Sequence, residues 1–395
     1  MNVLFLILIL GATLTSAVSE LSGQSGSLAT LTEITIKSAQ DALQLALTLA
    51  ASMAVFMGIL RIAELAELMP LLARPLMPLL RKLFPHNEPA LDAIALNVSA
   101  NLLGMGNAAT PFGLKAMSKL EDANPIKGIA SDAQIMFLAL NTAGITLLPA
   151  KVIALRASLG SVAPAAIVGP TLVASLCAAL AGLYAAWLMG DKTDKSSTPD
   201  LLWIVPILFI ATLAGLMVLF GAIIGPWLLP GMIAGFLCWG FVRGVRVYEG
   251  FVEGAMDGLL VTWRIAPYLI AILVAVGMAR GSGALDMIVA PVGSFLAPVG
   301  LPPQALLMAI VRTLSGSGAF GLLASTLAQV NTGPDTPLGI LLSTIYGSTE
   351  TTFYVIAVYF GAVGTTSLRH AVTVGLIADC AGLIAATLIC TVMFG

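Results

Sequence analysis

Glu350 is the residue whose type and surroundings most clearly suggest chemistry. It is the single charged residue between positions 336 and 368. Its neighbours carry hydroxyl groups, and they are Ser348, Thr349, Thr351 and Thr352. A carboxylate among hydroxyls can coordinate a cation, carry a proton, or bind an amine or hydroxyl of a solute. We therefore expect a possible coupling cation, Na+ or H+, near Glu350; the alternative is a helix-capping carboxylate at the membrane surface.

A second group of candidate residues consists of amides and hydroxyls in the first half of the chain. They are Asn97, Asn101, Asn107, Thr110, Asn141 and Thr142. Asn97 and Asn101 are four residues apart, so they share one face of a helix. Amide groups both donate and accept hydrogen bonds, which suits a solute with hydroxyls or a base. Hydrogen bonding between helices is the alternative role.

The second half supplies further hydroxyls in a glycine-rich setting. Ser315 and Ser317 alternate with glycines, so side-chain hydroxyls and backbone groups are both available to a ligand. With Ser348, Thr349, Glu350 and Thr351 they complete the predicted substrate-binding residues. Arg312 precedes them and can either meet an anion or extend to an interface. For Lys151 and Arg156 we expect extension toward the headgroups.

No motif typical of an enzyme is present in the sequence. His86 and His370 lie far apart, and there is no HExxH, GxSxG or Walker loop. The four cysteines lie in apolar stretches without metal-ligand spacing. We expect no enzyme activity, no cofactor and no metal site.

The composition is that of a membrane protein. Of the 395 residues, 58% are hydrophobic and 10% are charged, whereas soluble domains have about 25% charged residues. A net charge of −2 argues against nucleic acid as a partner. The expected partners are the lipid bilayer and a small polar solute, and a homo-oligomer is possible. The expected location is a bacterial inner membrane, crossed several times.

Long uncharged runs mark the membrane spans. Residues 157–190 can cross once, and residues 201–242 can cross twice, with the break expected at Gly225, Pro226 and Pro230. Further spans are expected at 39–62, 257–279 and 370–394. The apolar run 3–14 favours an uncleaved membrane helix over a signal peptide, because no basic residues precede it.

The order of features in the first half recurs in the second half. The matching pairs are proline-rich stretches (74–85 and 290–303), glycine-rich segments (97–117 and 312–325), second polar breaks (141–155 and 347–360) and closing spans (160–188 and 370–394). The predicted fold is all-α, a polytopic transmembrane helical bundle with two related repeats that contain broken or re-entrant helices. The expected domains are an N-terminal helix and connection (1–38), a first repeat (39–190), a linker with two transmembrane helices (191–250) and a second repeat (251–395).

Glycine and proline at these breaks interrupt the backbone hydrogen bonds of a helix. Unsatisfied backbone groups survive at membrane depth only where protein or a water-filled cavity surrounds them. Paired interruptions at matching positions of two repeats indicate the binding site of a transporter. Loops outside the membrane are the alternative for 97–117 and 312–325, and GPDTP (333–337) is expected to be a simple turn.

Four motifs carry a resemblance to known families. GNAATPFGLKAM (106–117) and NTAGITLLPAKVIALR (141–156) resemble the spore maturation protein A family. SGSGAFG (315–321) and STETTFYVIAVYFGAVG (348–364) resemble the spore maturation protein B family. The chain therefore looks like a fusion of the two, over roughly residues 40–190 and 250–394. Both families are grouped with the nucleoside recognition, or Gate, domain, which implies membrane transport through broken or re-entrant helices.

The favoured function is a secondary transporter or permease for a small polar solute, nucleoside-like or a small organic ion, bound at the interface of the two repeats. Alternating access would then move one repeat against the other. The alternative is a non-transporting membrane scaffold or accessory protein in envelope, cell-wall or spore-like maturation. An enclosed polar cavity at Glu350 and Asn107 favours transport, whereas dry or lipid-facing positions favour the scaffold.

Overall fold

The chain is a multi-pass, all-α membrane protein. The computed structural model describes residues 2–23, 25–85, 87–190, 201–284, 287 and 301–394. Within these residues all named elements are helices, and the β-pairing is confined to an isolated bridge between Ile129 and Ser367. A search of the described residues finds four helices long and apolar enough to cross a membrane: Ser27–Leu65, Pro164–Met189, Val247–Gly281 and Ala371–Phe394. The predicted fold class, including two related repeats with broken helices, is confirmed.

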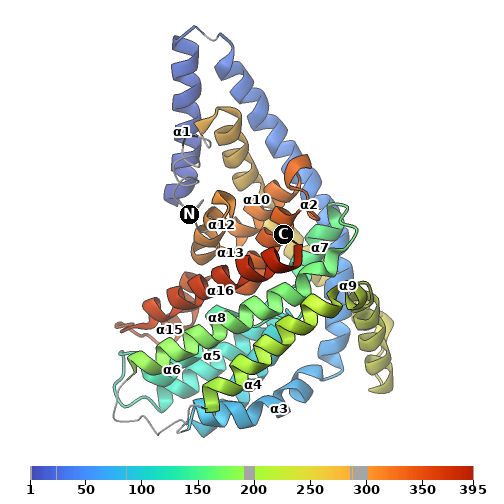
Figure 1. Cartoon of the computed structure of the whole chain (residues 1–395), viewed down its shortest axis with the longest axis vertical. Helices are drawn as coiled ribbons and strands as arrows, with labels where there is room; N and C mark the ends of the chain where they lie inside the picture. Colours follow the sequence, from blue (N-terminus) through green and yellow to red (C-terminus); the bar gives the residue numbers. More distant parts are fainter. Residues whose placement is uncertain are drawn as a thin grey trace.

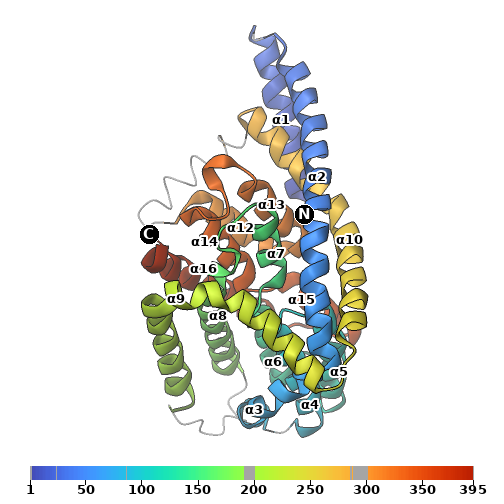
Figure 2. The same ribbon diagram turned by 90° about the vertical axis from the view of Figure 1, so that its right-hand side faces the viewer.

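Two long helices lie side by side and form one flank of the molecule (Figures 1 and 2). They are α2 (Ser27–Leu65) and α10 (Val247–Gly281), and α1 (Asn2–Leu21) packs against both at the narrow end. Glycines of α10 allow close approach: a Cβ at Gly258 would lie 2.6 Å from the carbonyl oxygen of Met53. Small residues at such contacts let membrane helices pack backbone to backbone.

The four helices around the breaks and the closing helix follow the same order in the two repeats. The first repeat has α3 (Leu68–Leu83), α4 (Glu88–Leu102), α5 (Gly106–Asp122), α6 (Asp132–Ala143), α7 (Ala150–Ser158), η1 (Pro164–Ile167) and α8 (Val168–Met189). The second has α12 (Pro303–Leu314), α13 (Gly316–Leu327), η4 (Val330–Thr332), α14 (Pro337–Ser348), α15 (Thr352–Ala362) and α16 (Ala371–Phe394). Each repeat is thus interrupted twice, at the four places where the sequence predicts breaks.

The closing helices of the repeats, α8 and α16, pack against each other through a reciprocal pair of glycines. A Cβ at Gly182 would lie 3.1 Å from the Cβ of Ala378, and a Cβ at Gly382 would lie 3.3 Å from the Cβ of Ala178. Such an exchange of contacts, in which each partner offers the same kind of residue to the other, is what a two-fold relation produces. The two repeats therefore face each other across α8 and α16.

One expectation about the linker is wrong. Residues 201–242 form a single helix, α9 (Leu201–Val242), so the expected break at Gly225, Pro226 and Pro230 does not end it; two crossings of the membrane by this segment stay a prediction. Figure 2 shows that α9 bends without ending. A proline removes one backbone hydrogen bond and kinks a helix, but the turns on either side can continue. The polar segment 191–200, and residues 290–300 of the second proline-rich stretch, lie outside the described residues.

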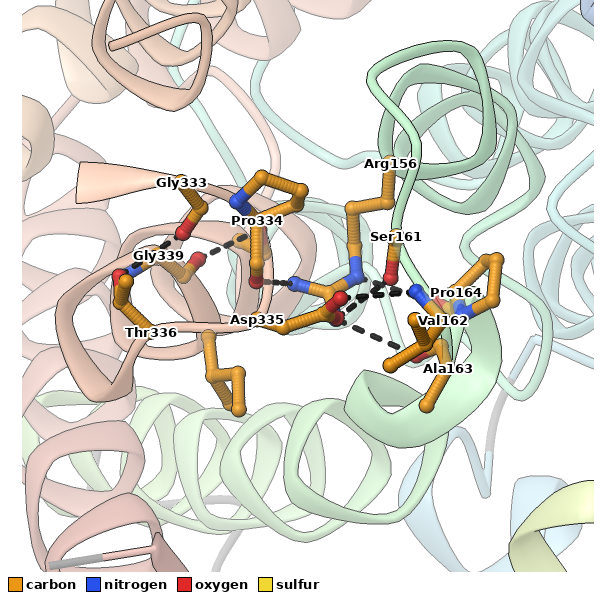
Figure 3. Close-up of polar contacts among 12 residues, drawn as sticks. Arg156, Ser161, Val162, Ala163, Pro164, Gly333, Pro334, Asp335, Thr336 and Gly339 are labelled. Carbon is orange, nitrogen blue, oxygen red and sulfur yellow. Dashed lines mark hydrogen bonds and ion pairs between the residues drawn. The ribbon is translucent and has the colours of Figure 1, made fainter. Parts of the chain in front are cut away.

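Apart from the contact between α8 and α16, a buried arginine also joins the two repeats (Figure 3). The Arg156 side chain is 0% exposed and donates to the carbonyl oxygens of Pro164 (3.1 Å), Ala163 (3.2 Å) and Pro334, and to Asp335 (3.1 Å). Asp335 also accepts hydrogen bonds from the Ser161 hydroxyl and the Val162 N–H. The expectation that Arg156 extends to the headgroups is therefore wrong, because carbonyls of two loops hold it inside the protein. The turn at 333–337 supplies part of this contact between repeats.

Candidate functional site

A cavity of about 530 Å³ lies where the helix breaks of the two repeats meet. Each break contributes to its wall: Gly104 from the first, Thr146, Leu148 and Pro149 from the second, Ser315 from the third, and Glu350 and Thr351 from the fourth. Tyr268 of α10 completes the lining on the side of the long helices. The cavity is thus shared by both repeats, and both of its halves are built from interrupted helices.

The first break of each repeat places the start of a helix at the cavity. Gly106 and Thr110 of α5 line it in one repeat, and Gly316 and Ser317 of α13 line it in the other. The Ser315 hydroxyl accepts a hydrogen bond from the Gly318 N–H (3.1 Å) and caps α13. Helix N-termini carry free N–H groups and partial positive charge. Two such ends make this part of the wall favourable for a negatively charged group.

The two breaks of the first repeat satisfy each other's backbone groups. The carbonyl oxygen of Leu102, at the end of α4, accepts hydrogen bonds from the N–H groups of Leu147 (2.9 Å) and Leu148 (3.3 Å). Gly104 has φ +71°, and a Cβ there would collide with the carbonyl oxygen of Leu148. Only glycine fits this position, because it tolerates positive φ and lets the two breaks touch.

The second breaks of the two repeats are in direct contact. The backbone N–H of Glu350 donates to the carbonyl oxygen of Thr142 at 2.7 Å. Gly144, at φ +50°, lies under Glu350, so that a Cβ there would be 2.8 Å from Cγ of Glu350. The carbonyl at the end of α6 is thereby satisfied by the opposite repeat. This contact fixes where the Glu350 side chain leaves the backbone.

Arg312 organises the break that contains Glu350. Its guanidinium donates to the Thr349 carbonyl through Nε (2.8 Å) and to the Thr351 hydroxyl (3.3 Å). It also forms an ion pair with Glu350 (3.2 Å) and lies 4.4 Å from the ring centre of Tyr346. The Arg312 side chain is only 7% exposed, whereas that of Glu350 is 46% exposed. Both residues line the cavity, and Arg312 is the one buried against the break whereas Glu350 is the more exposed partner.

A second carboxylate lies behind this network. Asp379 of α16 accepts hydrogen bonds at Oδ2 from the hydroxyls of Thr352 (2.6 Å) and Thr313 (3.0 Å). It is not among the residues that line the cavity. Its contacts join α12, α15 and α16 at the back of the fourth break.

Amides and a tyrosine join the repeats on another side of the cavity. Asn141 accepts hydrogen bonds at Oδ1 from the Tyr359 hydroxyl (3.1 Å) and from Nδ2 of Asn101 (3.4 Å). Asn97 donates to the Ala109 carbonyl (2.9 Å) and to the Tyr359 hydroxyl (3.3 Å). The Tyr359 ring packs against Phe137 with centroids 5.5 Å apart. Asn97 and Asn141 thus work partly as contacts between helices, the alternative that the sequence leaves open.

The structure sorts the predicted site residues into three groups. Those that line the cavity are Asn101, Thr110, Asn141, Ser315, Ser317, Glu350 and Thr351. Those buried behind the wall are Asn97, Thr142, Ser348 and Thr349. Asn107 lies on α5, and its side chain is outside the described residues. Contact of these side chains with a solute stays a prediction.

Several lining residues are not among the predicted site residues. They are Lys151, Arg312, Tyr268, Tyr346, Tyr354 and Tyr359. Lys151 directly follows the second break, and three of the tyrosines flank the fourth, so their closeness to a break was the available signal. Tyr268 lies in the middle of α10, directly after Pro267, and because the helix continues through this proline no helix break points to the residue.

Comparisons with known proteins agree with this architecture. A family model described as "Gate: Nucleoside recognition" matches residues 46–159 and 262–366. Spore maturation protein B of Bacillus subtilis (strain 168) is 41% identical over 168 residues, which is 42% of this chain and 93% of that protein. Spore maturation protein A of the same organism is 37% identical over 162 residues, which is 40% of this chain and 83% of that protein.

A solved structure also resembles the whole chain. It is the structure of CNTnw in an inward-facing substrate-bound state, at 14% identity and a TM-score of 0.41, covering 100% of this chain and 96% of that one. A similarity of this size carries no argument about function.

Proposed function

Because the chain belongs to the Gate family of nucleoside-recognition domains, we propose that it is a secondary transporter or permease for a small polar solute. The observation that carries the proposal is the convergence of all four helix breaks on one cavity. Two breaks come from each repeat, so the cavity lies at the interface that alternating access has to open and close. We place the protein in a bacterial inner membrane.

The contacts between the repeats at the cavity are suited to such a movement. They include one backbone hydrogen bond, from Glu350 to Thr142, and the hydroxyl of Tyr359 on Asn141. Each can be replaced by water or by a solute group when the repeats separate. Separating a wall of amides, hydroxyls and charges costs little free energy, because water replaces the lost contacts. Separating an apolar interface would cost more, because it exposes apolar surface to water.

Glu350 is the proposed position of a coupling cation, Na+ or H+. Its side chain is 46% exposed and its partner, Arg312, is held in place by other contacts. A cation or proton that reaches Glu350 weakens the ion pair and can change how the fourth break is held. Because the fourth break is part of the cavity wall, ion binding at Glu350 would change the shape of the cavity.

The names of the two relatives support a second candidate function. Both are called spore maturation proteins. The second candidate is therefore a non-transporting scaffold or accessory protein in envelope or spore-like maturation. In that case the cavity binds no small solute, and the polar breaks serve contacts inside the bundle.

A thermal-shift screen of the purified full-length protein in lipid nanodiscs distinguishes the two. Nucleosides, amino acids, small carboxylates and cations are tested, and a bound ligand raises the melting temperature by mass action. Compounds that stabilise the protein are then tested for uptake into proteoliposomes. Transport predicts at least one compound that is both stabilising and transported. A purified, folded protein that binds none and transports none supports the scaffold.

A further inference from the structure

The cavity wall has an excess of positive charge. Its lining includes two cationic side chains, Lys151 and Arg312, and one carboxylate, Glu350. Charged groups at membrane depth are costly and require partners. Which of the cations already has a partner therefore determines what the cavity can bind.

Arg312 is fully engaged within the protein. Its charge is paired with Glu350 at 3.2 Å, and its N–H groups are directed to the Thr349 carbonyl and the Thr351 hydroxyl. Its flat face lies over the ring of Tyr346. A solute that bound Arg312 would have to break these contacts. Arg312 therefore stabilises the cavity wall and is not available to a solute.

Lys151 is different. It lies in the first turn of α7, directly after the break that ends with Pro149, and it lines the cavity. Among the described residues, none forms a hydrogen bond or ion pair with its ammonium group. Asp379, the other nearby acid, is outside the lining and holds the hydroxyls of Thr313 and Thr352. Lys151 therefore lines the cavity without a hydrogen-bonded or ion-paired anion, because Glu350, the carboxylate on the same wall, is paired with Arg312 and acts on Lys151 only from a distance.

The surroundings of Lys151 favour an anion as well. The N-termini of α5 and α13 open onto the same cavity, and Gly104, Gly106, Gly316 and Gly347 bring bare backbone to its wall. Partial positive charge at helix starts adds to that of the lysine. These features add positive potential to the cavity that Lys151 lines.

We propose that the solute is an organic monoanion whose carboxylate binds Lys151. The inference rests on the proposed transport function and narrows its substrate class. One unpaired cation matches one negative charge, whereas a phosphate carries about −1.5 to −2 at neutral pH and would need more. A neutral nucleoside would leave the ammonium of Lys151 unpaired in the cavity. The amides of Asn101 and Asn141 then remain for hydroxyl or ring groups of the same solute.

The test compares monocarboxylates with their neutral amides. Formate is compared with formamide, acetate with acetamide and benzoate with benzamide. Inorganic phosphate is tested as a separate ligand, and the ionic strength is the same throughout. Apparent affinity is measured by thermal shift of the full-length protein in nanodiscs. The variants are Lys151→Gln and Lys151→Arg, with Lys115→Gln on the exposed face of α5 as the matched control.

We expect the carboxylates to stabilise the protein and the amides to bind at least about tenfold more weakly, the size of a lost charge-assisted hydrogen bond. Lys151→Gln should lose that preference, while Lys151→Arg keeps part of it and Lys115→Gln keeps all of it. The inference is overturned if amides bind as well as carboxylates, if phosphate binds more tightly than they do, or if no Lys151-dependent stabilisation by a carboxylate is seen.

Failure of the anion inference can be distinguished from failure of the transport proposal. If the native protein takes up a neutral solute into proteoliposomes and neither binds nor takes up the carboxylates, the anion inference fails and the transport proposal stands. If no solute of either kind is taken up although carboxylates bind through Lys151, the inference about binding stands and the transport proposal fails.

Discussion

The backbone N–H of Glu350 donates a 2.7 Å hydrogen bond to the carbonyl oxygen of Thr142. This bond joins the second break of one repeat to the second break of the other. It places the acid of the fourth break directly against the opposite repeat. Changes at Glu350 can therefore affect both the cavity wall and the contact between repeats.

Replacing Glu350 with glutamine tests its role in coupling. Glu350→Gln removes the charge that pairs with Arg312 and that can bind a cation, and it keeps the size of the side chain. We expect membrane insertion to be normal and uptake driven by an ion gradient to be abolished. Proteoliposome uptake, with and without a Na+ or H+ gradient, measures this. Glu249→Gln, at an exposed position in the first turn of α10, is the control; unchanged coupled uptake in Glu350→Gln refutes the assignment.

Substitution of Gly104 tests the close contact between the two breaks of the first repeat. Gly104→Ala and Gly160→Ala both place a side chain at positive φ (+71° and +77°), which costs about 1–2 kcal/mol. A Cβ at position 104 also collides with the carbonyl of Leu148, whereas nothing lies within 4 Å of one at position 160. Overpacking of this kind costs roughly 1–3 kcal/mol more. Thermal melting should show a clearly larger loss for Gly104→Ala, and equal losses would contradict the close contact between the breaks.

Arg312 is predicted to stabilise the fourth break. Arg312→Met removes the donors to the Thr349 carbonyl and leaves Glu350 without its cation. We expect a loss of about 1–3 kcal/mol, the typical cost of unpaired polar groups, because the 46% exposure of Glu350 lets water replace part of the ion pair. Arg312→Lys should recover part of the melting temperature. Arg81→Met, on the exposed face of α3, is the control; a loss no larger than that of the control argues against this role.

Asp335 is predicted to hold Arg156 between the repeats. Asp335→Asn removes the carboxylate and leaves the fully buried guanidinium with uncharged partners, the backbone carbonyls and the Ser161 hydroxyl. Breaking a buried pair costs about 3–5 kcal/mol, and we expect about 1–3 kcal/mol here since the Asp335 side chain is 35% exposed. The readout is the melting temperature in nanodiscs, with the exposed Asp92→Asn as control. An unchanged melting temperature would show that the ion pair contributes little.

The local features of the fold could be predicted from the sequence. Glycine, proline and polar residues interrupt apolar runs at 97–117, 141–150, 312–325 and 347–352, and each run ends a helix in the structure. These breaks depend on backbone properties that each residue carries with it, so a single sequence is enough. Membrane class follows in the same way, from composition.

Contacts between distant residues could not be predicted. Arg156 and Asp335 are 179 positions apart, and Tyr359 is 218 positions from Asn141. A buried arginine in a membrane helix has the same local sequence as one that reaches the headgroups, and only the packing of the two repeats decides between them. The single helix α9 has a similar cause, because the sequence shows where a proline lies but not whether the turns around it continue.

The central claim is that the four breaks enclose one water-accessible cavity between the repeats. Its most direct test is the reaction of single cysteines with a charged, membrane-impermeant thiol reagent, in a protein whose four native cysteines are replaced. Thr110→Cys and Ser317→Cys lie on the cavity wall in different repeats, and Ile384→Cys lies on an outer face of α16 at 59% exposure. We predict that the two cavity cysteines react and that a transported solute protects both, while Ile384→Cys stays unreactive in lipid. No reaction at either cavity position, in a folded protein, would contradict the claim.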